Sequence, residues 1–307
     1  MLSRRHFVVV LLLLACWLPA TLKAQDLYIG AGSTVGEYGL NGQPINASLF
    51  SVQGGLGIAV AGNDAFVIHD YGGTPSTIEE YTTSGTLVNA ALITMDSPSA
   101  IAISGNDLFV ADFYGGTVGE YGLDGSTINA SLITGLHGPE GITISGNDLF
   151  VANEGIGGNP DGAGTIGEYT TSGTTVNASL VSGLDIPMGL AISGNNLFVA
   201  NWNGSANTVG EYTTSGATIN ASLITGLNNP SGIAIWGNDL FVLNDWVRGT
   251  LGEYTTSGQA INASLITGLD DAVGIVIVPE PSAVVLVGMS AAALWLWGRR
   301  KRERNGV

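Results

Sequence analysis

The sequence predicts an all-β fold, a six-bladed β-propeller with four short strands in each blade. Three observations support it: a unit of about 42 residues recurs six times, each copy has four apolar segments separated by turn residues, and no helical periodicity persists within a copy. A recurring Glu-Tyr pair marks the copies by its tyrosines, Tyr38, Tyr81, Tyr121, Tyr169, Tyr212 and Tyr254. A period of this length is typical of propellers, solenoids and arrays.

The last complete copy shows the four predicted strands in order. They cover residues 231–235, 239–242, 250–254 and 260–266, which are rich in β-branched and aromatic residues. Gly237-Asn238 joins the first two strands, and these residue types suit a two-residue hairpin turn. Thr-Thr-Ser-Gly joins the third and fourth strands with turn residues.

The phase of the repeat predicts how the domain closes. Residues 26–29 match the second strand of a blade, and residues 273–277 match the first strand. The two ends of the domain are therefore expected to complete one blade, which would close the ring and remove exposed sheet edges. An open solenoid remains the alternative, because a period alone does not establish closure.

Residues 230–235 followed by 237–242 show the segments that recur from copy to copy. Through these segments the copies resemble NHL-type and related six-bladed propellers, and the resemblance extends from residue 26 to 278. The resemblance implies the fold and leaves the function open, since propellers include both binding proteins and enzymes.

The beginning of the chain is typical of a secretory signal peptide. Arg4 and Arg5 precede an apolar run, and Ala24 offers a small residue for cleavage, so we assign residues 1–24 to the signal and 25–278 to the propeller. Residues 13–16 loosely resemble a lipobox, which leaves a lipoprotein as an alternative. Because Cys16 is the only cysteine, the exported domain is expected to have no disulfides and to depend on its core.

The end of the chain, residues 279–307, combines three features in order. The motif Pro279, Glu280 and Pro281 precedes an apolar stretch, residues 283–297, and then the basic residues Arg299, Arg300, Lys301 and Arg302. Their order, spacing and terminal position resemble a PEP-CTERM sorting signal. The resemblance implies a bacterial envelope protein, recognition of Pro-Glu-Pro by an exosortase-type enzyme, and an association with exopolysaccharide. A plain C-terminal transmembrane anchor is the alternative, and both interpretations place the propeller outside the cytoplasm.

Charge is distributed unevenly along the chain. Residues 25–278 contain 23 acidic side chains and one basic side chain, Arg248, which gives the domain a net charge of −22. Nucleic acid is therefore excluded as an expected partner, since phosphate binding requires clusters of Lys and Arg. Divalent cations and neutral glycans remain compatible with this charge, which also favours solubility.

Some recurring residues are expected to be structural. One glutamate occurs in every copy, and an active site needs an asymmetric group of residues, so we expect these six side chains to repeat one structural role: Glu37, Glu80, Glu120, Glu168, Glu211 and Glu253. The Asn-Ala-Ser triplets match a glycosylation sequon, and we interpret them as blade consensus: Asn46, Asn129, Asn177, Asn220 and Asn262.

Departures from the repeat point to a candidate site at one mouth of the central channel. The start of each first strand and the end of each second strand share this face, and the starts are Leu56, Ser99, Glu140, Met188, Ser231 and Val273. At the ends stand Ala31, His69, Asp112, Asn153, Asn201 and Asn244. Among them, Glu140, Asp112, Asn153 and Asn201 offer the oxygen ligands that Ca²⁺ or another divalent cation prefers. His69 is a candidate base or ligand.

This set resembles in kind the metal site of gluconolactonase-like and paraoxonase-like propellers, which implies a divalent ion that polarises a lactone carbonyl. Two other departures are an insertion at residues 155–164 and the pair Trp202 and Trp246, which could either present an aromatic platform to a sugar ring or belong to the core.

The sequence leaves two functions open. The first is a noncatalytic propeller that is exported to the envelope, sorted through its C-terminal signal and binds a protein or an extracellular polysaccharide. The second is a metal-dependent lactone hydrolase or lyase on the same ring.

Overall fold

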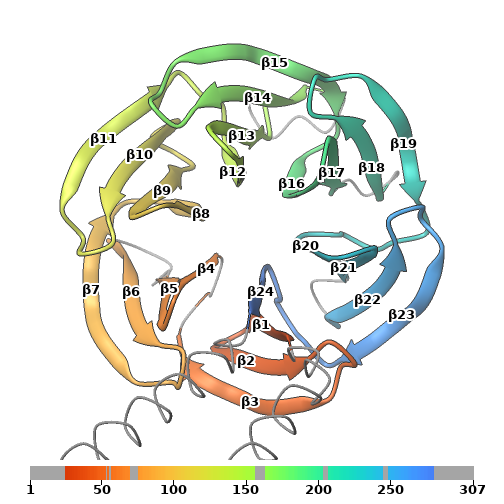
Figure 1. Ribbon diagram of the computed structural model, residues 1–307, viewed down its shortest axis with the longest axis horizontal. Coiled ribbons are helices and arrows are strands. Elements are labelled where there is room, and N and C mark those ends of the chain that lie inside the picture. Colours follow the sequence, from red (N-terminus) through yellow and green to blue (C-terminus); the bar gives the residue numbers. More distant parts are fainter. Residues whose placement is uncertain are drawn as a thin grey trace, which may run out of the picture. The chain divides into compact units, whose positions relative to one another are not determined.

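The computed structural model describes residues 25–52, 54, 57–69, 75–155, 163–202, 207–244 and 248–279. Within these ranges, twenty-four strands form six four-stranded sheets. The sheets are the blades of a ring, with the first strand of each blade nearest the centre (Figure 1). The predicted all-β, six-bladed propeller with four-stranded blades is confirmed for this part of the chain.

The strands of the first three blades, written from the centre outwards, have the following bounds. Blade 1 contains β24 (Gly274–Pro279), β1 (Gln25–Ala31), β2 (Thr34–Gly39) and β3 (Pro44–Ser51). Blade 2 contains β4 (Ile58–Ala61), β5 (Asp64–His69), β6 (Ser76–Thr82) and β7 (Leu87–Met95). Blade 3 contains β8 (Pro98–Ser104), β9 (Asp107–Asp112), β10 (Thr117–Gly122) and β11 (Thr127–Thr134).

The remaining three blades repeat this arrangement. Blade 4 contains β12 (Pro139–Ser145), β13 (Asp148–Asn153), β14 (Gly164–Thr170) and β15 (Thr175–Leu184). Blade 5 contains β16 (Pro187–Ser193), β17 (Asn196–Asn201), β18 (Thr208–Thr213) and β19 (Thr218–Ile224). Blade 6 contains β20 (Ile233–Trp236), β21 (Asp239–Asn244), β22 (Thr250–Thr255) and β23 (Ala260–Thr267). The four strands predicted for this last copy are all present, with ends shifted by a few residues.

The ring closes through blade 1. The sheet order β24-β1-β2-β3 places the last strand of the domain beside the first, as the phase of the repeat predicted. A hydrogen bond from the amide of Val273 to the carbonyl of Gly30, 3.2 Å long, lies at the start of this pairing. β24 extends to Pro279, so the first residue of the predicted sorting motif ends this strand.

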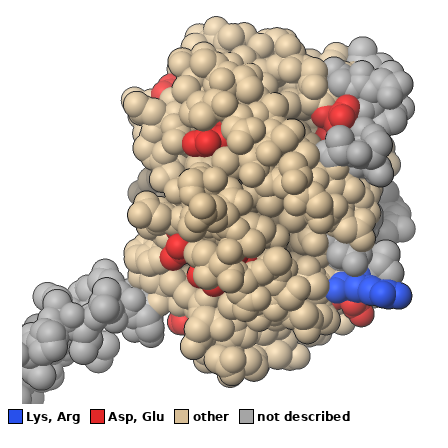
Figure 2. Space-filling view, turned by 90° about the vertical axis from the view of Figure 1, so that its right-hand side faces the viewer, with Lys and Arg blue, Asp and Glu red and all other residues tan. Residues whose placement is uncertain are grey.

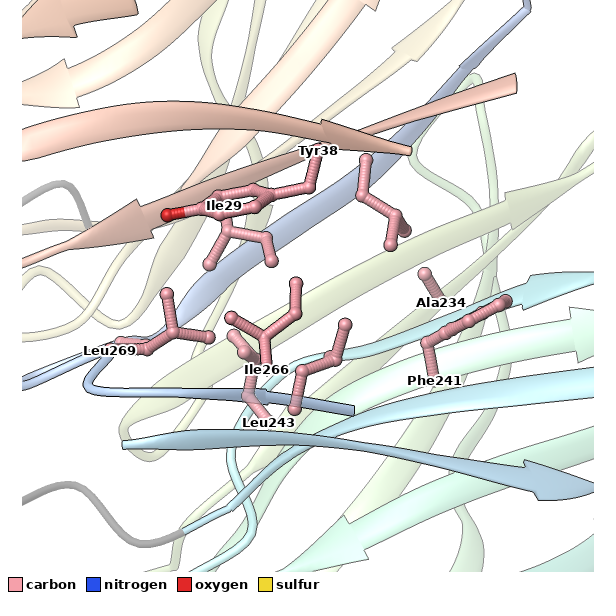
Figure 3. Packing of buried hydrophobic residues seen from close by; sticks show 10 residues of the cluster. Ile29, Tyr38, Ala234, Phe241, Leu243, Ile266 and Leu269 are labelled. Atoms are coloured by element: carbon pink, nitrogen blue, oxygen red, sulfur yellow. The ribbon is translucent and has the colours of Figure 1, made fainter. Parts of the chain in front are cut away.

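The core is divided among the six interfaces between neighbouring blades. Six clusters of buried apolar side chains occupy these interfaces, one for each neighbouring pair, including the pair formed by blades 6 and 1. Figure 3 shows this last cluster, in which Ile29 and Tyr38 of blade 1 pack with Ala234, Phe241 and Leu243 of blade 6. A solenoid of six repeats would have only five such interfaces, so the ring is closed and the open alternative is wrong.

Turn chemistry follows the predicted pattern. In the hairpin between β8 and β9, Ser104 pairs with Asp107, which leaves Gly105 and Asn106 as a two-residue loop. Gly105 has φ +63°, whereas φ of Asn106 is not positive. The loop is therefore a type II′ turn, in which glycine occupies the first central position. The hairpins between the third and fourth strands also carry a glycine with positive φ, and it packs on the outer strand of the preceding blade.

Residues Asp26–Val278 form one compact unit. In the part of the chain that the structure describes, no helix has the length and apolar character to cross a membrane. The predicted signal peptide and C-terminal transmembrane helix lie outside the described residues.

Candidate functional site

The first strands of the six blades line a narrow central channel. Residues from β4, β8, β12, β16, β20 and β24 surround a cavity of about 100 Å³ along it. At one end the channel widens into a second cavity of about 420 Å³, which we call the channel-mouth cavity. Five of the predicted strand starts line it, namely Ser99, Glu140, Met188, Ser231 and Val273, while Leu56 lies outside the described residues.

Loops at the same end add aromatic side chains to this cavity. Phe113 and Tyr114 follow β9, Trp202 follows β17, and all three line the cavity. The rings of Phe113 and Tyr114 are 5.0 Å apart between centroids and nearly perpendicular. Trp202 is half-buried, whereas Tyr114 is 84% exposed. Of the two tryptophans suggested as an aromatic platform, Trp202 therefore lies at the candidate site, and Trp246 lies outside the described residues.

Glu140 is the carboxylate that the channel and the channel-mouth cavity share. It is the second residue of β12 and lines both. Burial raises the pKa of its carboxyl group to about 7, with the charge of Glu154 acting in the same direction as a smaller cause. Burial also raises the pKa of Glu154 itself. Glu140 can therefore change charge near neutral pH, a property that marks candidate functional residues.

The two serines at the channel mouth have structural partners. The Ser99 hydroxyl donates a hydrogen bond to the carbonyl of Pro139 in the next blade. The Ser231 hydroxyl donates to the carbonyl of Ala272, 3.0 Å away. These bonds join neighbouring blades around the channel, so the hydroxyl groups position the strands that surround the cavity.

The other three predicted metal ligands do not line the channel-mouth cavity. The Asp112 carboxylate accepts a hydrogen bond of 2.9 Å from the amide of Gly115 in its own turn. The side-chain amides of Asn153 and Asn201 point to the third strand of their blades, where they donate to Thr165 and Thr208 over 3.5 and 3.4 Å. Asn153 lines a separate cavity beside His137. The described residues therefore do not bring the four predicted ligands into one cavity.

Asn153 and Asn201 nevertheless retain an unusual feature. Both are 5% exposed, and the side-chain oxygen of each is buried without a hydrogen-bond partner in the structure. Buried polar atoms are nearly always paired, so each of these oxygens has capacity for a further donor or a cation. Over the described ranges, no three His, Cys, Asp or Glu side chains come together as a metal-binding group.

His69, the predicted base, belongs to a buried network that the sequence did not predict. Its Nδ1 lies 2.8 Å from Oε1 of Glu79, which is 4% exposed, and the Tyr81 hydroxyl donates to Oε2 of Glu79 over 2.6 Å. In the other five blades a glycine occupies the position of Glu79, and a Cβ there would approach the tyrosine ring to 2.6–2.8 Å. The departure from Gly-Glu-Tyr to Glu-Glu-Tyr was the signal that could have revealed this network.

The six recurring glutamates share one environment, while their structural role stays a prediction. Burial raises the pKa of each, and in five blades the charge of a nearby aspartate adds to this effect: Glu37, Glu80, Glu120, Glu168 and Glu253. In blade 5, Asn196 stands at the position of this aspartate and donates a hydrogen bond of 2.9 Å to Glu211.

The asparagines of the sequon-like triplets also have one repeated role. In all six outer strands the side-chain oxygen of the asparagine accepts a hydrogen bond from the backbone amide two residues later. In blade 2 this acceptor is Asn89 and the donor is Ala91, so the interaction does not need the hydroxyl of the triplet.

Comparisons with known proteins show the fold. No protein-family model matches the chain, and no curated protein matches it. One chain of a crystallised nidogen/laminin complex has a TM-score of 0.69 at 16% identity, covering 82% of this chain and 98% of that chain. A protein from Lactobacillus plantarum has a TM-score of 0.58 at 15% identity, covering 84% of this chain and 100% of that chain.

An enzyme is also among the similar structures. A gluconolactonase from Xanthomonas campestris has a TM-score of 0.54 at 15% identity, covering 68% of this chain and 74% of that chain. At such identities a likeness concerns the arrangement of the strands and not the chemistry of the site. The chain is therefore a six-bladed β-propeller whose structural neighbours include a gluconolactonase.

Proposed function

We propose that this chain is an exported, envelope-associated propeller that binds an extracellular polymer without catalysis, and that the polymer docks in the channel-mouth cavity. The observation that supports this most directly is the cavity itself, about 420 Å³ in volume, with Phe113, Tyr114 and Trp202 along its lining. Ligand pockets are concave and mostly apolar, with a few polar groups that fix orientation. Aromatic rings beside polar groups suit the flat faces and hydroxyl groups of a polysaccharide.

Binding to isolated exopolysaccharide tests this proposal. We expect Tyr114→Ala and Trp202→Ala to weaken binding by roughly tenfold each, as truncation of a central aromatic contact commonly does. Trp236→Ala is the matched control, because Trp236 is 44% exposed but lies beside the β20–β21 hairpin at the other end of its strand. Equal effects of all three substitutions, or no binding by the unsubstituted chain, would contradict the proposal.

Export and sorting form a second part of the proposal, supported by the sequence pattern alone. We propose that residues 1–24 direct secretion and that residues 279–307 hold the precursor in the inner membrane until an exosortase-type enzyme recognises Pro279, Glu280 and Pro281. The mature propeller would then reach the cell surface or matrix. Replacing Glu280 by Ala should retain the chain in the inner membrane in a host that has the sorting enzyme, whereas a plain anchor predicts the same fractionation for both chains.

A metal-dependent lactone hydrolase or lyase is the second candidate. Glu140 in the channel-mouth cavity favours it. Asn153 and Asn201 do not line that cavity, so their unpaired buried oxygens would have to reorient to share a cation with Glu140. Thermal unfolding with Ca²⁺ and with chelator tests it, because a metal that binds the native state must stabilise it. The enzyme proposal expects a rise in Tm with Ca²⁺ that Glu140→Ala abolishes, followed by metal-dependent lactone hydrolysis. Equal Tm values in Ca²⁺ and chelator would contradict it.

A further inference from the structure

The channel-mouth cavity combines acidic and aromatic side chains. Glu140 and Asp96 line it together with Phe113, Tyr114 and Trp202. Glu154 lies close enough to Glu140 for its charge to act on that carboxyl group. A ligand in this cavity would therefore meet carboxylates and aromatic rings at the same time.

The negative charge at this site has no basic side chain to balance it. Arg248 is the only Lys or Arg in residues 25–278, and it lies exposed in the loop between β21 and β22, outside the lining of the cavity. Burying a carboxylate without a partner is costly, and a second carboxylate nearby adds to the cost. A cation that enters the cavity would lower both the cost of burying Glu140 and the cost of its repulsion from Glu154.

The aromatic side chains narrow the choice of cation. Ammonium groups bind over the faces of Trp, Tyr and Phe within about 6 Å of the ring centroid, and groups of such rings recognise quaternary ammonium ligands. Tyr114 is 84% exposed although it carries a large apolar ring, and it forms a perpendicular pair with Phe113. A metal ion gains from oxygen ligands and would leave these rings without a role.

The surface of the propeller also favours a cation. Figure 2 shows one side of it, where acidic groups are spread over the surface and basic groups are almost absent. With a net charge of −22 in residues 25–278, the domain attracts positive ligands and repels negative ones.

We propose that the channel-mouth cavity binds an ammonium group, so that the preferred polymer is a polysaccharide of amino sugars with free rather than acetylated amines. This inference rests on the proposed binding function and names its ligand class. Glu140 pairs with the ammonium group, and Phe113, Tyr114 and Trp202 surround it. The sugar rings extend from the cavity mouth, where Tyr114 is exposed.

Calorimetry on the full chain in mild detergent tests this inference with two oligosaccharides of equal length. The first is a tetramer of N,N,N-trimethylglucosamine, whose charge does not depend on pH, and the second is the neutral N-acetylglucosamine tetramer. Both are measured at pH 8, where Glu140 is mainly ionised, and with chelator present so that no metal contributes. We expect the cationic tetramer to bind about tenfold more tightly, as a carboxylate and aromatic faces together provide.

Three variants separate the possible outcomes. Glu140→Gln should remove most of the preference for the cationic tetramer, Tyr114→Ala should weaken its binding, and Trp236→Ala should change neither. If the neutral tetramer binds equally well or better, the inference is overturned while the polymer-binding function stands. If neither tetramer binds, both the inference and glycan binding at this cavity are overturned.

Discussion

At the scale of single residues, position within the ring distinguishes Glu140 from the other glutamates. The recurring glutamates lie on third strands, where partial burial raises their pKa values. Glu140 lies at the start of a first strand, where the walls of the channel desolvate it and raise its pKa to about 7. Its protonation state is therefore coupled to the stability of the ring.

This coupling predicts a pH-dependent effect of Glu140→Gln. Because the folded pKa lies above the ordinary value of 4.5, protonation of Glu140 stabilises the folded state at low pH, and this stabilisation is lost as pH rises through about 7. Glutamine stays neutral throughout. We expect equal stability of the two chains near pH 4, below the unfolded pKa, and an advantage of the variant on the order of 2 kcal/mol near pH 9, measured by chemical unfolding. An advantage that does not change with pH would contradict this prediction.

The network around Glu79 shows a second kind of residue-level change. Introducing a carboxyl group where the other blades have glycine places a polar group in a buried position, which is costly without partners. His69 and Tyr81 provide those partners at 2.8 and 2.6 Å. Blade 2 therefore replaces a packing arrangement based on glycine with one based on hydrogen bonds.

At the scale of elements, the outer hairpins connect neighbouring blades. Gly125, in the hairpin between β10 and β11, has φ +80°, and a Cβ there would lie 2.6 Å from the carbonyl oxygen of Leu92 in blade 2. The same relation occurs at Gly42, where the neighbour is Leu265, so it continues across the closure of the ring. These glycines provide both a turn conformation and a close approach between blades.

Two substitutions separate these roles. Gly105 has φ +63°, and a Cβ there would meet no atom within 4 Å. Gly105→Ala should therefore lower the free energy of unfolding only by the cost of a positive φ in alanine, about 1–2 kcal/mol. Gly125→Ala should cost more, about 3 kcal/mol or above, because backbone must also move away from Leu92. Urea unfolding of both variants provides the comparison. Equal losses would show that the contact with Leu92 accommodates a Cβ at Gly125 without an added cost.

At the scale of the whole molecule, stability depends on a strand contributed by the far end of the domain. β24 lies beside β1, and its apolar residues pack in the clusters on both sides of blade 1. Without it, the edge of β1 would be open and two of the six interfaces would lose side chains. An open edge also invites pairing with other chains.

We therefore expect deletion of residues 273–279 from the 25–279 fragment to abolish cooperative unfolding or to cause aggregation. The matched control moves these residues in front of Gln25, joined by a Gly-Asn turn like that at Gly105. This permuted chain keeps every strand pair, and we expect it to recover most of the stability in calorimetry. Failure of the permuted chain, or a stable truncated chain, would show that closure through blade 1 is not what holds the ring together.

The sequence by itself determined the number of blades, the four strands in each and the pairing of the two ends, because repeats of hydrophobic pattern and turn residues are local features. It also placed Glu140 at one mouth of the channel and named Trp202 as a possible aromatic platform, without placing that tryptophan at the mouth. Only the tertiary structure decided that Asp112, Asn153 and Asn201 do not line the cavity of Glu140, because their hydrogen bonds to neighbouring strands and turns set the position of each side chain. The tertiary structure also decided the pairing of Glu79 with His69 and the position of Phe113 and Tyr114 in the lining of the cavity. Both depend on which side chains come into contact in space, and the repeat pattern does not specify those contacts.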